Sequence, residues 1–213
     1  MKEKPMLFST LMVQALLKRQ KTQTRRIINP QPIIDTESGH VYAKNNNVLL
    51  DIHKWKDKMI ELCDYSIGQT IWVRETFMNA PNYPDMPEKY YYKASKSDQF
   101  LQEWKGCWKP SIFMPKDACR LFLTIKNIRI ERLNEISEAD AIAEGIIPLL
   151  QSNAQTQQEG LLFFDYSKNP KLFQDGLTPQ KSYKTLWEKI NGNDSWEQNP
   201  YVYVYDFEIK NKN

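Results

Sequence analysis

The first regular pattern of apolar and polar positions predicts a helix near the N-terminus. In the segment STLMVQALLKRQ, four apolar residues recur at helical spacing and share one face: Leu11, Met12, Ala15 and Leu16. Ser9 and Thr10 are both suitable N-caps, since a short hydroxyl side chain accepts a hydrogen bond from a free amide of the first turn. We therefore predict an amphipathic helix that begins near residue 10.

Alternating patterns predict several strands. In SIGQTIWVRETF a turn leads into a strand with Ile71 and Val73 on one face. Residues 121–133 alternate like one long strand, or like two strands separated by a bulge at residues 126–127. The segments YYYKA and YVYVYDFEI predict a short aromatic strand and a closing strand.

Two further helices are predicted from their start and stop signals. SEADAIAEGI has Ser137 as N-cap, Asp140 at the capping-box position and Gly145 as the stop. PQKSYKTLWEKING begins at Pro179 and ends at Gly192. Its apolar face is predicted to contain Tyr183, Leu186, Trp187 and Ile190.

Three segments lack a sustained period and are interpreted as insertions: residues 29–60, 78–118 and 147–178. The first mixes Pro and Asn with short β-like runs and is predicted to be a long loop or a peripheral hairpin. The order of the remaining elements predicts an α+β fold. Its small, mostly antiparallel sheet is expected to curl into a barrel flanked by helices, within a single domain of residues 1–213.

Composition narrows the classes of function. A formal net charge of +3 is too small for a general polyanion binder, so any affinity for nucleic acid must come from a local patch. Cys63, Cys107 and Cys119 show no CxxC spacing, and His40 and His53 are not near them in sequence. We expect no metal site, no cofactor and a reducing, cytoplasmic environment. No apolar run has the length of a membrane span, so no membrane partner is expected.

A basic segment, KRQKTQTRR, follows the first predicted helix. It places five cations, two threonines and two glutamines in nine residues. Cations are favourable at the C-terminal end of a helix dipole, which accounts for the charge but not for the repeated threonines.

Several segments resemble the ASCH domain family, whose members are PUA-like β-barrels. LLKRQKTQTRR resembles the family signature G-R-K-T-x-T-x-R, although Gln20 departs from it, and SIGQTIWVRE resembles the strand G-D-x-L-x-V, with Gln69 in place of Asp. LNEISEADAIAEGI is similar to the helix I-T-x-E-x-A-x-x-E-G, and NPYVYVYDFEI to the last strand. The three insertions fall outside these segments, as in the longer ASCH proteins of phages and prophages.

The resemblance implies an activity. Small bacterial ASCH proteins include a metal-independent amidohydrolase that deacetylates acetylcytidine, and its catalytic groups correspond to Lys21, Thr24 and Glu144. These residue types suit the reaction. A threonine becomes a nucleophile when a base takes its proton, and a lysine is such a base only when burial or neighbouring cations lower its pKa. Glu144 would protonate the departing amine, and Lys21 and Thr24 would share a face if they lay in a helical turn.

Residues beyond this catalytic set are expected to contact a modified nucleoside: Arg25, Arg26, Trp72, Arg74 and Glu75. The alternative is an RNA-binding module or ribonuclease that binds single-stranded RNA, with phosphate contacts from Lys21, Arg25, Arg26 and Arg74. Aromatic residues would then stack on bases in a groove, unless they simply pack in the core: Tyr90, Tyr91, Tyr92, Trp104 and Trp108. A closed cavity sized for one nucleoside favours the enzyme, and an open basic groove favours RNA. The sequence does not identify the natural substrate or the oligomeric state.

Overall fold

The fold was analysed in a computed structural model. It describes residues 2–43, 48–79, 89–97, 100–101, 106–149, 162–168 and 176–210. The α+β class predicted from the sequence is confirmed. Contacts divide the chain into two compact units, each of which is described separately. Unit 1 comprises Met1–Arg19, Ile67–Lys126 and Phe207–Asn213, and unit 2 comprises Gln20–Ser66 and Asn127–Asp206.

The main sheet has five strands. Their order is β1 (Lys4–Leu7), β6 (Thr70–Arg74), β9 (Phe122–Arg132), β10 (Tyr201–Lys210) and β2 (Gln23–Ile27). β1 is parallel to β6, whereas β6–β9 and β10–β2 are antiparallel. The described strands form no closed barrel.

The long strand β9 shows the irregularity predicted for it. Leu123 and Ile125 are buried before residues 126–127, and Ile128 and Ile130 are buried after them. The two consecutive exposed positions shift the alternation by one residue, as a bulge does. The boundary between the two units falls at the same place in β9.

In unit 1, α1 (Thr10–Leu17) confirms the first predicted helix, and the Ser9 hydroxyl accepts a hydrogen bond from the Met12 amide at 3.4 Å. β7 (Phe77–Asn79) and β8 (Tyr90–Tyr92) form a two-stranded antiparallel sheet, which confirms the aromatic strand. Three short 3-10 helices follow: η1 (Lys93–Ser95), η2 (Ser111–Phe113) and η3 (Lys116–Ala118).

The segment predicted as a loop or hairpin at residues 29–60 is more ordered than expected. It forms a three-stranded antiparallel sheet of β3 (Ile33–Asp35), β4 (His40–Ala43) and β5 (Val48–Asp51), followed by helix α2 (Trp55–Glu61). These short elements become stable together because their apolar residues share one core with residues of β9 and β10: Val41, Leu50, Trp55, Met59, Ile130 and Tyr203. No single element is long enough to show this in its own periodicity.

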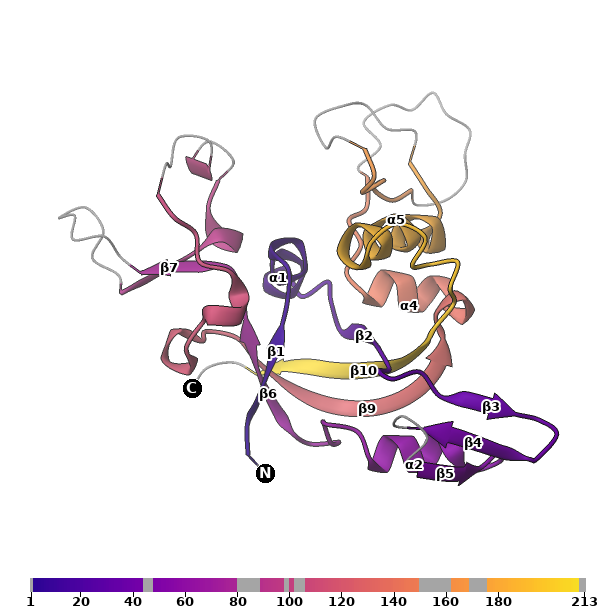
Figure 1. Cartoon of the computed structure of the whole chain (residues 1–213). Helices are drawn as coiled ribbons and strands as arrows, with labels where there is room; N and C mark the ends of the chain where they lie inside the picture. Colours follow the sequence, from indigo (N-terminus) through magenta and orange to yellow (C-terminus); the bar gives the residue numbers. More distant parts are fainter. Residues whose placement is uncertain are drawn as a thin grey trace. The chain divides into compact units, whose positions relative to one another are not determined.

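Two helices of unit 2 lie on the opposite side of β9 and β10 from the β3–β5 sheet and α2 (Figure 1). α4 (Glu138–Ala143) has Ser137 as its N-cap and ends before Gly145, whose φ of 85° favours glycine. α5 (Pro179–Asn191) begins and ends as predicted, but Ile190 is 50% exposed and does not belong to its buried face. The short 3-10 helix η4 (Leu133–Glu135) joins β9 to the segment before α4.

Much of the predicted insertion at residues 147–178 lies outside the described residues, as does part of residues 78–118. Among the helices that are described, none combines the length and the apolar character needed to cross a membrane.

Candidate functional site

The second half of the basic segment, residues 23–26, lies in strand β2 and not in a helical turn. Arg19 has a φ of 57° after the end of α1, and the chain then enters β2, which pairs with β10. The expectation that Lys21 and Thr24 share a helical face is therefore wrong, because Thr24 lies in a strand and Lys21 lies before it. Successive residues of a strand face opposite sides, so Gln23 and Arg25 lie on one face of β2 and Thr24 on the other.

Lys21 and Glu144 form a buried ion pair. Lys21 Nζ lies 2.7 Å from Glu144 Oε2 and donates a second hydrogen bond to the backbone oxygen of Glu144 at 2.8 Å. Their side chains are only 1% and 3% exposed. A backbone hydrogen bond from Thr22 to Ala143, at 2.9 Å, fastens the segment before β2 to the end of α4. Two residues 123 positions apart are thus held together without solvent between them.

Arg25 binds the second oxygen of the same carboxylate. Its Nη1 lies 3.2 Å from Glu144 Oε1, and its Nη2 lies 3.0 Å from Glu131 and 3.2 Å from Asp140. Glu144 therefore has one cation on each oxygen. The Arg25 side chain is fully buried, and its positive charge is balanced by the carboxylates of Glu131, Asp140 and Glu144.

Polar residues around Arg25 extend this cluster toward solvent. Asp140 accepts hydrogen bonds from Gln23 at 3.0 Å and from Arg25, and forms a salt bridge to Arg129 at 3.0 Å. Arg129 also reaches Asp206 at 2.7 Å. The sequence had suggested only a capping role for Asp140. Its backbone amide does bind Ser137, at 3.1 Å, but its carboxylate supports Arg25.

Tyr183 of α5 is a member of the site that the sequence pattern did not identify. It is 3% exposed, and its side chain is hydrogen-bonded to Glu144. Burial, together with the charge of Glu144, raises the pKa of Tyr183 well above its usual value. The hydroxyl therefore stays protonated and donates to the carboxylate. The only sequence signal for Tyr183 was its place on an apolar helix face, which is equally typical of a core residue.

The pKa values of Lys21 and Arg25 are shifted in opposite directions. Burial lowers the pKa of Lys21, Glu144 opposes that shift, and the neighbouring Arg26 and Arg25 add to it. The pKa of Lys21 ends below its usual value. Burial would also lower the pKa of Arg25, but Glu144 and other acidic neighbours outweigh it and leave that pKa raised. Lys21 is accordingly the cation that gives up a proton most easily.

Thr24 lies near this cluster in sequence but is not bonded to it. It is 4% exposed and is paired with Tyr205 on the neighbouring strand β10. Arg26, two residues on, is also largely buried, and burial lowers the pKa of its guanidinium. Within the described part of the chain, no hydrogen bond joins Thr24 to Lys21 or Glu144. The structure thus brings Lys21, Arg25 and Glu144 together, whereas Thr24 lies on the opposite face of β2 from Arg25.

The other predicted substrate contacts belong to unit 1, where their visible roles are structural. The Arg74 guanidinium lies 5.3 Å from the centre of the Trp72 ring and donates to the backbone oxygens of Ile112 and of Met114, the latter at 3.1 Å. Glu75 is 1% exposed and accepts two hydrogen bonds from Arg120, both at 2.8 Å.

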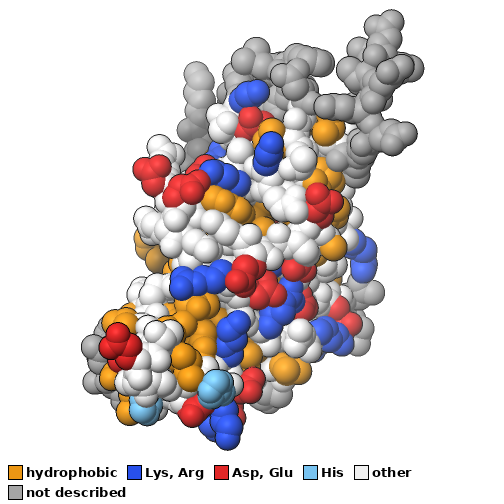
Figure 2. Space-filling view, turned by 90° about the vertical axis from the view of Figure 1, so that its right-hand side faces the viewer, with side chains coloured by type: hydrophobic (Ala, Val, Ile, Leu, Met, Phe, Trp, Pro, Cys, Tyr) orange, Lys and Arg blue, Asp and Glu red, His pale blue; other side chains and the backbone are white. Residues whose placement is uncertain are grey.

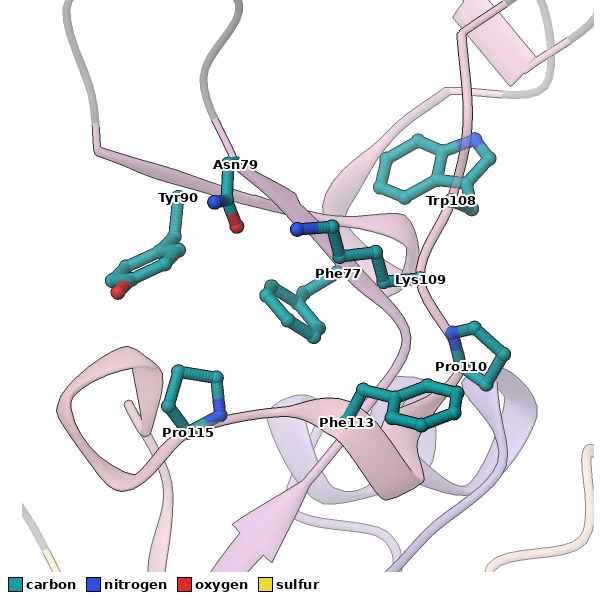
Figure 3. A pocket seen from close by; sticks show the side chains of 8 residues that line it. All are labelled: Phe77, Asn79, Tyr90, Trp108, Lys109, Pro110, Phe113 and Pro115. Atoms are coloured by element: carbon teal, nitrogen blue, oxygen red, sulfur yellow. The ribbon is translucent and has the colours of Figure 1, made fainter.

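The aromatic residues expected to stack on bases divide into two groups. Tyr91 is buried, and the Tyr92 hydroxyl donates to Ala118 O at 2.7 Å, so both help to build unit 1. Tyr90 and Trp108 line a pocket of about 550 Å³ (Figure 3). Trp104 lies outside the described residues.

Comparison of the chain with protein-family models, with curated proteins and with solved structures finds no match. The chemistry of the site must therefore be inferred from its residues and their geometry.

Proposed function

We propose that the chain is a metal-independent amidohydrolase that removes the acyl group from acetylcytidine or a related modified nucleoside, on a PUA-like fold of the ASCH type. The observation that carries this proposal is the buried contact of 2.7 Å between Lys21 Nζ and Glu144 Oε2. It joins a lysine of lowered pKa to a carboxyl group, which is the combination that base-assisted acyl transfer needs.

The reaction starts with a proton shift inside the pair. Transfer of a proton from Lys21 to Glu144 leaves a neutral amine and a carboxylic acid, so the base and the acid arise together without an outside proton donor. Burial lowers the pKa of Lys21, which makes the loss of its proton easier.

Acyl transfer then proceeds through Thr24. The Thr24 oxygen attacks the amide carbon as Lys21 takes the hydroxyl proton. Glu144 then gives its proton to the exocyclic nitrogen of the cytosine ring as the carbon–nitrogen bond breaks. The acyl group remains on Thr24 as an ester. Water, deprotonated by the same groups, then releases acetate and restores Thr24. The described structure has no Thr24–Lys21 hydrogen bond, so this step requires the two side chains to come together when substrate binds, as catalytic contacts often do.

Arg25 and Tyr183 orient the acid in this scheme. Each binds Glu144, so the carboxyl group keeps one position while its proton moves. Groups that are held in place before the reaction add no reorganisation cost during it.

The alternative, RNA binding through the basic segment, fits these contacts less well. Lys21 and Arg25 already have carboxylate partners and are buried, so a phosphate would have to replace those partners. On the face shown in Figure 2, basic and acidic side chains lie interspersed and do not form a continuous basic surface. A backbone-tracking interface requires the opposite arrangement.

The test is incubation of the purified chain with acetylcytidine and chromatographic detection of cytidine and acetate. We expect turnover by the native chain and its loss in Thr24→Ala and in Lys21→Arg, because a guanidinium keeps its proton at neutral pH. The double variant should be little worse than either single one, since groups that act as a unit are non-additive.

Thr22→Ala and Lys18→Arg are the matched controls, since both residues are exposed and lie in the same stretch of chain. Both should retain activity. Normal turnover by Lys21→Arg would show that Lys21 is only a fixed charge, and no release of cytidine by the native chain would refute the proposed substrate.

A further inference from the structure

Unit 1 contains a pocket that the proposed hydrolase site does not use. Its volume is about 550 Å³, within the usual range for small-molecule sites, and aromatic rings occupy several of its walls (Figure 3). The rings belong to Phe77, Tyr90, Trp108 and Phe113, and the polar groups that reach it include the Lys109 ammonium. Phe113 is 69% exposed.

The walls of the pocket are held in place by bonds outside it. The Tyr90 hydroxyl donates to Asp117 at 2.8 Å, and its ring packs edge-on against Phe77 with 6.0 Å between ring centres. The backbones of Phe77 and Lys109 exchange two hydrogen bonds, at 3.2 and 2.7 Å. These contacts fix the rings before any ligand arrives, so little ordering cost remains for binding.

Arg74 fixes the remaining wall. Its guanidinium donates to two backbone oxygens, of Ile112 and of Met114, on either side of Phe113. Met114 is completely buried and anchors the same loop. Arg74 therefore positions the exposed Phe113 ring. This structural role is independent of any substrate contact at the Lys21 site.

The charge around the pocket favours an anionic ligand. Of the six lysine and arginine residues in 89–97 and 106–120, three form salt bridges: Lys89 with Asp117, Lys116 with Glu3 and Arg120 with Glu75. The charged side chain that lines the pocket itself is Lys109. Asp117 is already bound by Lys89 at 2.9 Å and by Tyr90. Within the described residues, Lys109 has no salt-bridge partner. Its Nζ lies 5.9 Å from the centre of the Phe77 ring, on the pocket wall.

We propose that this pocket binds an unpaired nucleobase, stacked on its aromatic rings, with the phosphate of the same nucleotide at Lys109. Stacking on aromatic side chains combined with backbone contacts from lysine is how proteins bind single-stranded nucleic acid without reading its sequence. Proline-rich peptides also use aromatic grooves, but they carry no phosphate to bind the Lys109 ammonium. The site shares no residue with the Lys21–Glu144 pair and stands whether or not the hydrolase proposal holds.

Fluorescence anisotropy of a fluorescein-labelled single-stranded oligouridylate of about ten nucleotides tests this proposal in the full chain, by the measured affinity and its salt dependence. Phe113→Ala should weaken binding about tenfold, in the range found for loss of one stacked base, and Phe113→Tyr should restore it. Lys109→Ala should also reduce the slope of log affinity against log salt by about 0.7, the value for one phosphate contact on a single strand.

Two exposed residues of unit 1 that do not line the pocket supply matched controls. Ile112→Ala removes an apolar side chain that is 57% exposed, and Lys18→Ala removes an exposed cation. Both should bind as the native chain does. The exposed positions of Phe113 and Lys109 make loss of folding an improbable cause of any change, and circular dichroism of each variant checks this.

Competition distinguishes the source of the nucleotide. Displacement of the probe by uridine or adenosine monophosphate assigns the pocket to free nucleotides, whereas displacement by unlabelled oligonucleotide alone assigns it to single strands, and both results support the shared chemistry. No binding at 50 mM salt, equal loss in Phe113→Ala and Ile112→Ala, or displacement by a polyproline peptide would each overturn it.

Discussion

Replacement of Glu144 by Gln tests the electrostatic core of the site. The substitution keeps the size and shape of the side chain and removes its charge, so Lys21 and Arg25 lose the carboxylate that lies 2.7 Å and 3.2 Å from them. Arg25 keeps Glu131 and Asp140 as partners. Lys21 keeps neutral acceptors at residue 144, the backbone oxygen and the new amide oxygen, but loses its carboxylate partner.

The expected loss of stability follows from this difference between the remaining partners of Arg25 and those of Lys21. Removal of one partner from a buried ion pair destabilises a protein by about 3 to 5 kcal/mol, because an uncompensated charge stays buried. For a chain of 213 residues this corresponds to a fall in the melting temperature of about 2 to 4 °C per kcal/mol, or about 6 to 20 °C in total. The cost should be smaller at high pH, since Lys21 already has a lowered pKa and escapes the penalty by losing its proton.

Differential scanning calorimetry at pH 6 and pH 9 measures both effects. Glu197→Gln is the control, because Glu197 forms a comparable pair with Lys184 on the surface, where solvent screens the interaction. Its melting temperature should stay close to that of the native chain at both pH values.

Two outcomes would show that the reasoning is wrong. If Glu144→Gln melts like Glu197→Gln, the Lys21–Glu144 pair is open to water. If its deficit is the same at pH 6 and pH 9, Lys21 does not exchange its proton in this pH range, and its use as a general base fails with it.

Two further predictions concern protonation and orientation. The folded-state pKa of Lys21 lies below its unfolded value, so the unfolded chain binds more protons between the two values and stability should rise with pH there; urea titrations of Lys21→Met should lack this rise. Tyr183→Phe removes a hydrogen bond to the charged Glu144 and should lower kcat on acetylcytidine about tenfold while KM changes little. Tyr203→Phe, which loses a hydrogen bond to Met59 instead, should keep its kcat, and equal losses in the two variants would contradict an orienting role for Tyr183.

The helices were predictable because their signals are local. Ser9 and Ser137 cap their helices with the side-chain bonds expected of them, and Pro179 and Gly192 lie at the two ends of α5. Each signal involves atoms within a few residues of one another. The position of Ile190 was mispredicted because exposure at the last turn of a helix depends on what packs there, which periodicity does not contain.

Strand β2 was not predicted from the sequence because it contains charged residues. Gln23–Ile27 reads QTRRI, and two adjacent arginines normally indicate a solvated segment. Arg25 is buried because Glu131, Asp140 and Glu144 surround it, and these residues lie more than a hundred positions away in the chain. The resemblance of motifs indicated that Lys21 and Glu144 belong to one site. It did not indicate that Tyr183 and Asp140 support that site, since neither belongs to the shared signature.

The short helix α4 explains how so small an element holds a reacting group in place. It has six residues, too few for a helix that is stable alone, and it is attached both to β2 and to the residue just before β2. Near its start, Asp140 binds Gln23 and Arg25, and at its end the oxygen of Ala143 accepts the amide of Thr22. Glu144 follows directly, so its position is set by the sheet through these bonds. A shift of the carboxylate relative to Lys21 would have to break them, and this is why the distance between these two side chains is fixed by the fold before a substrate binds.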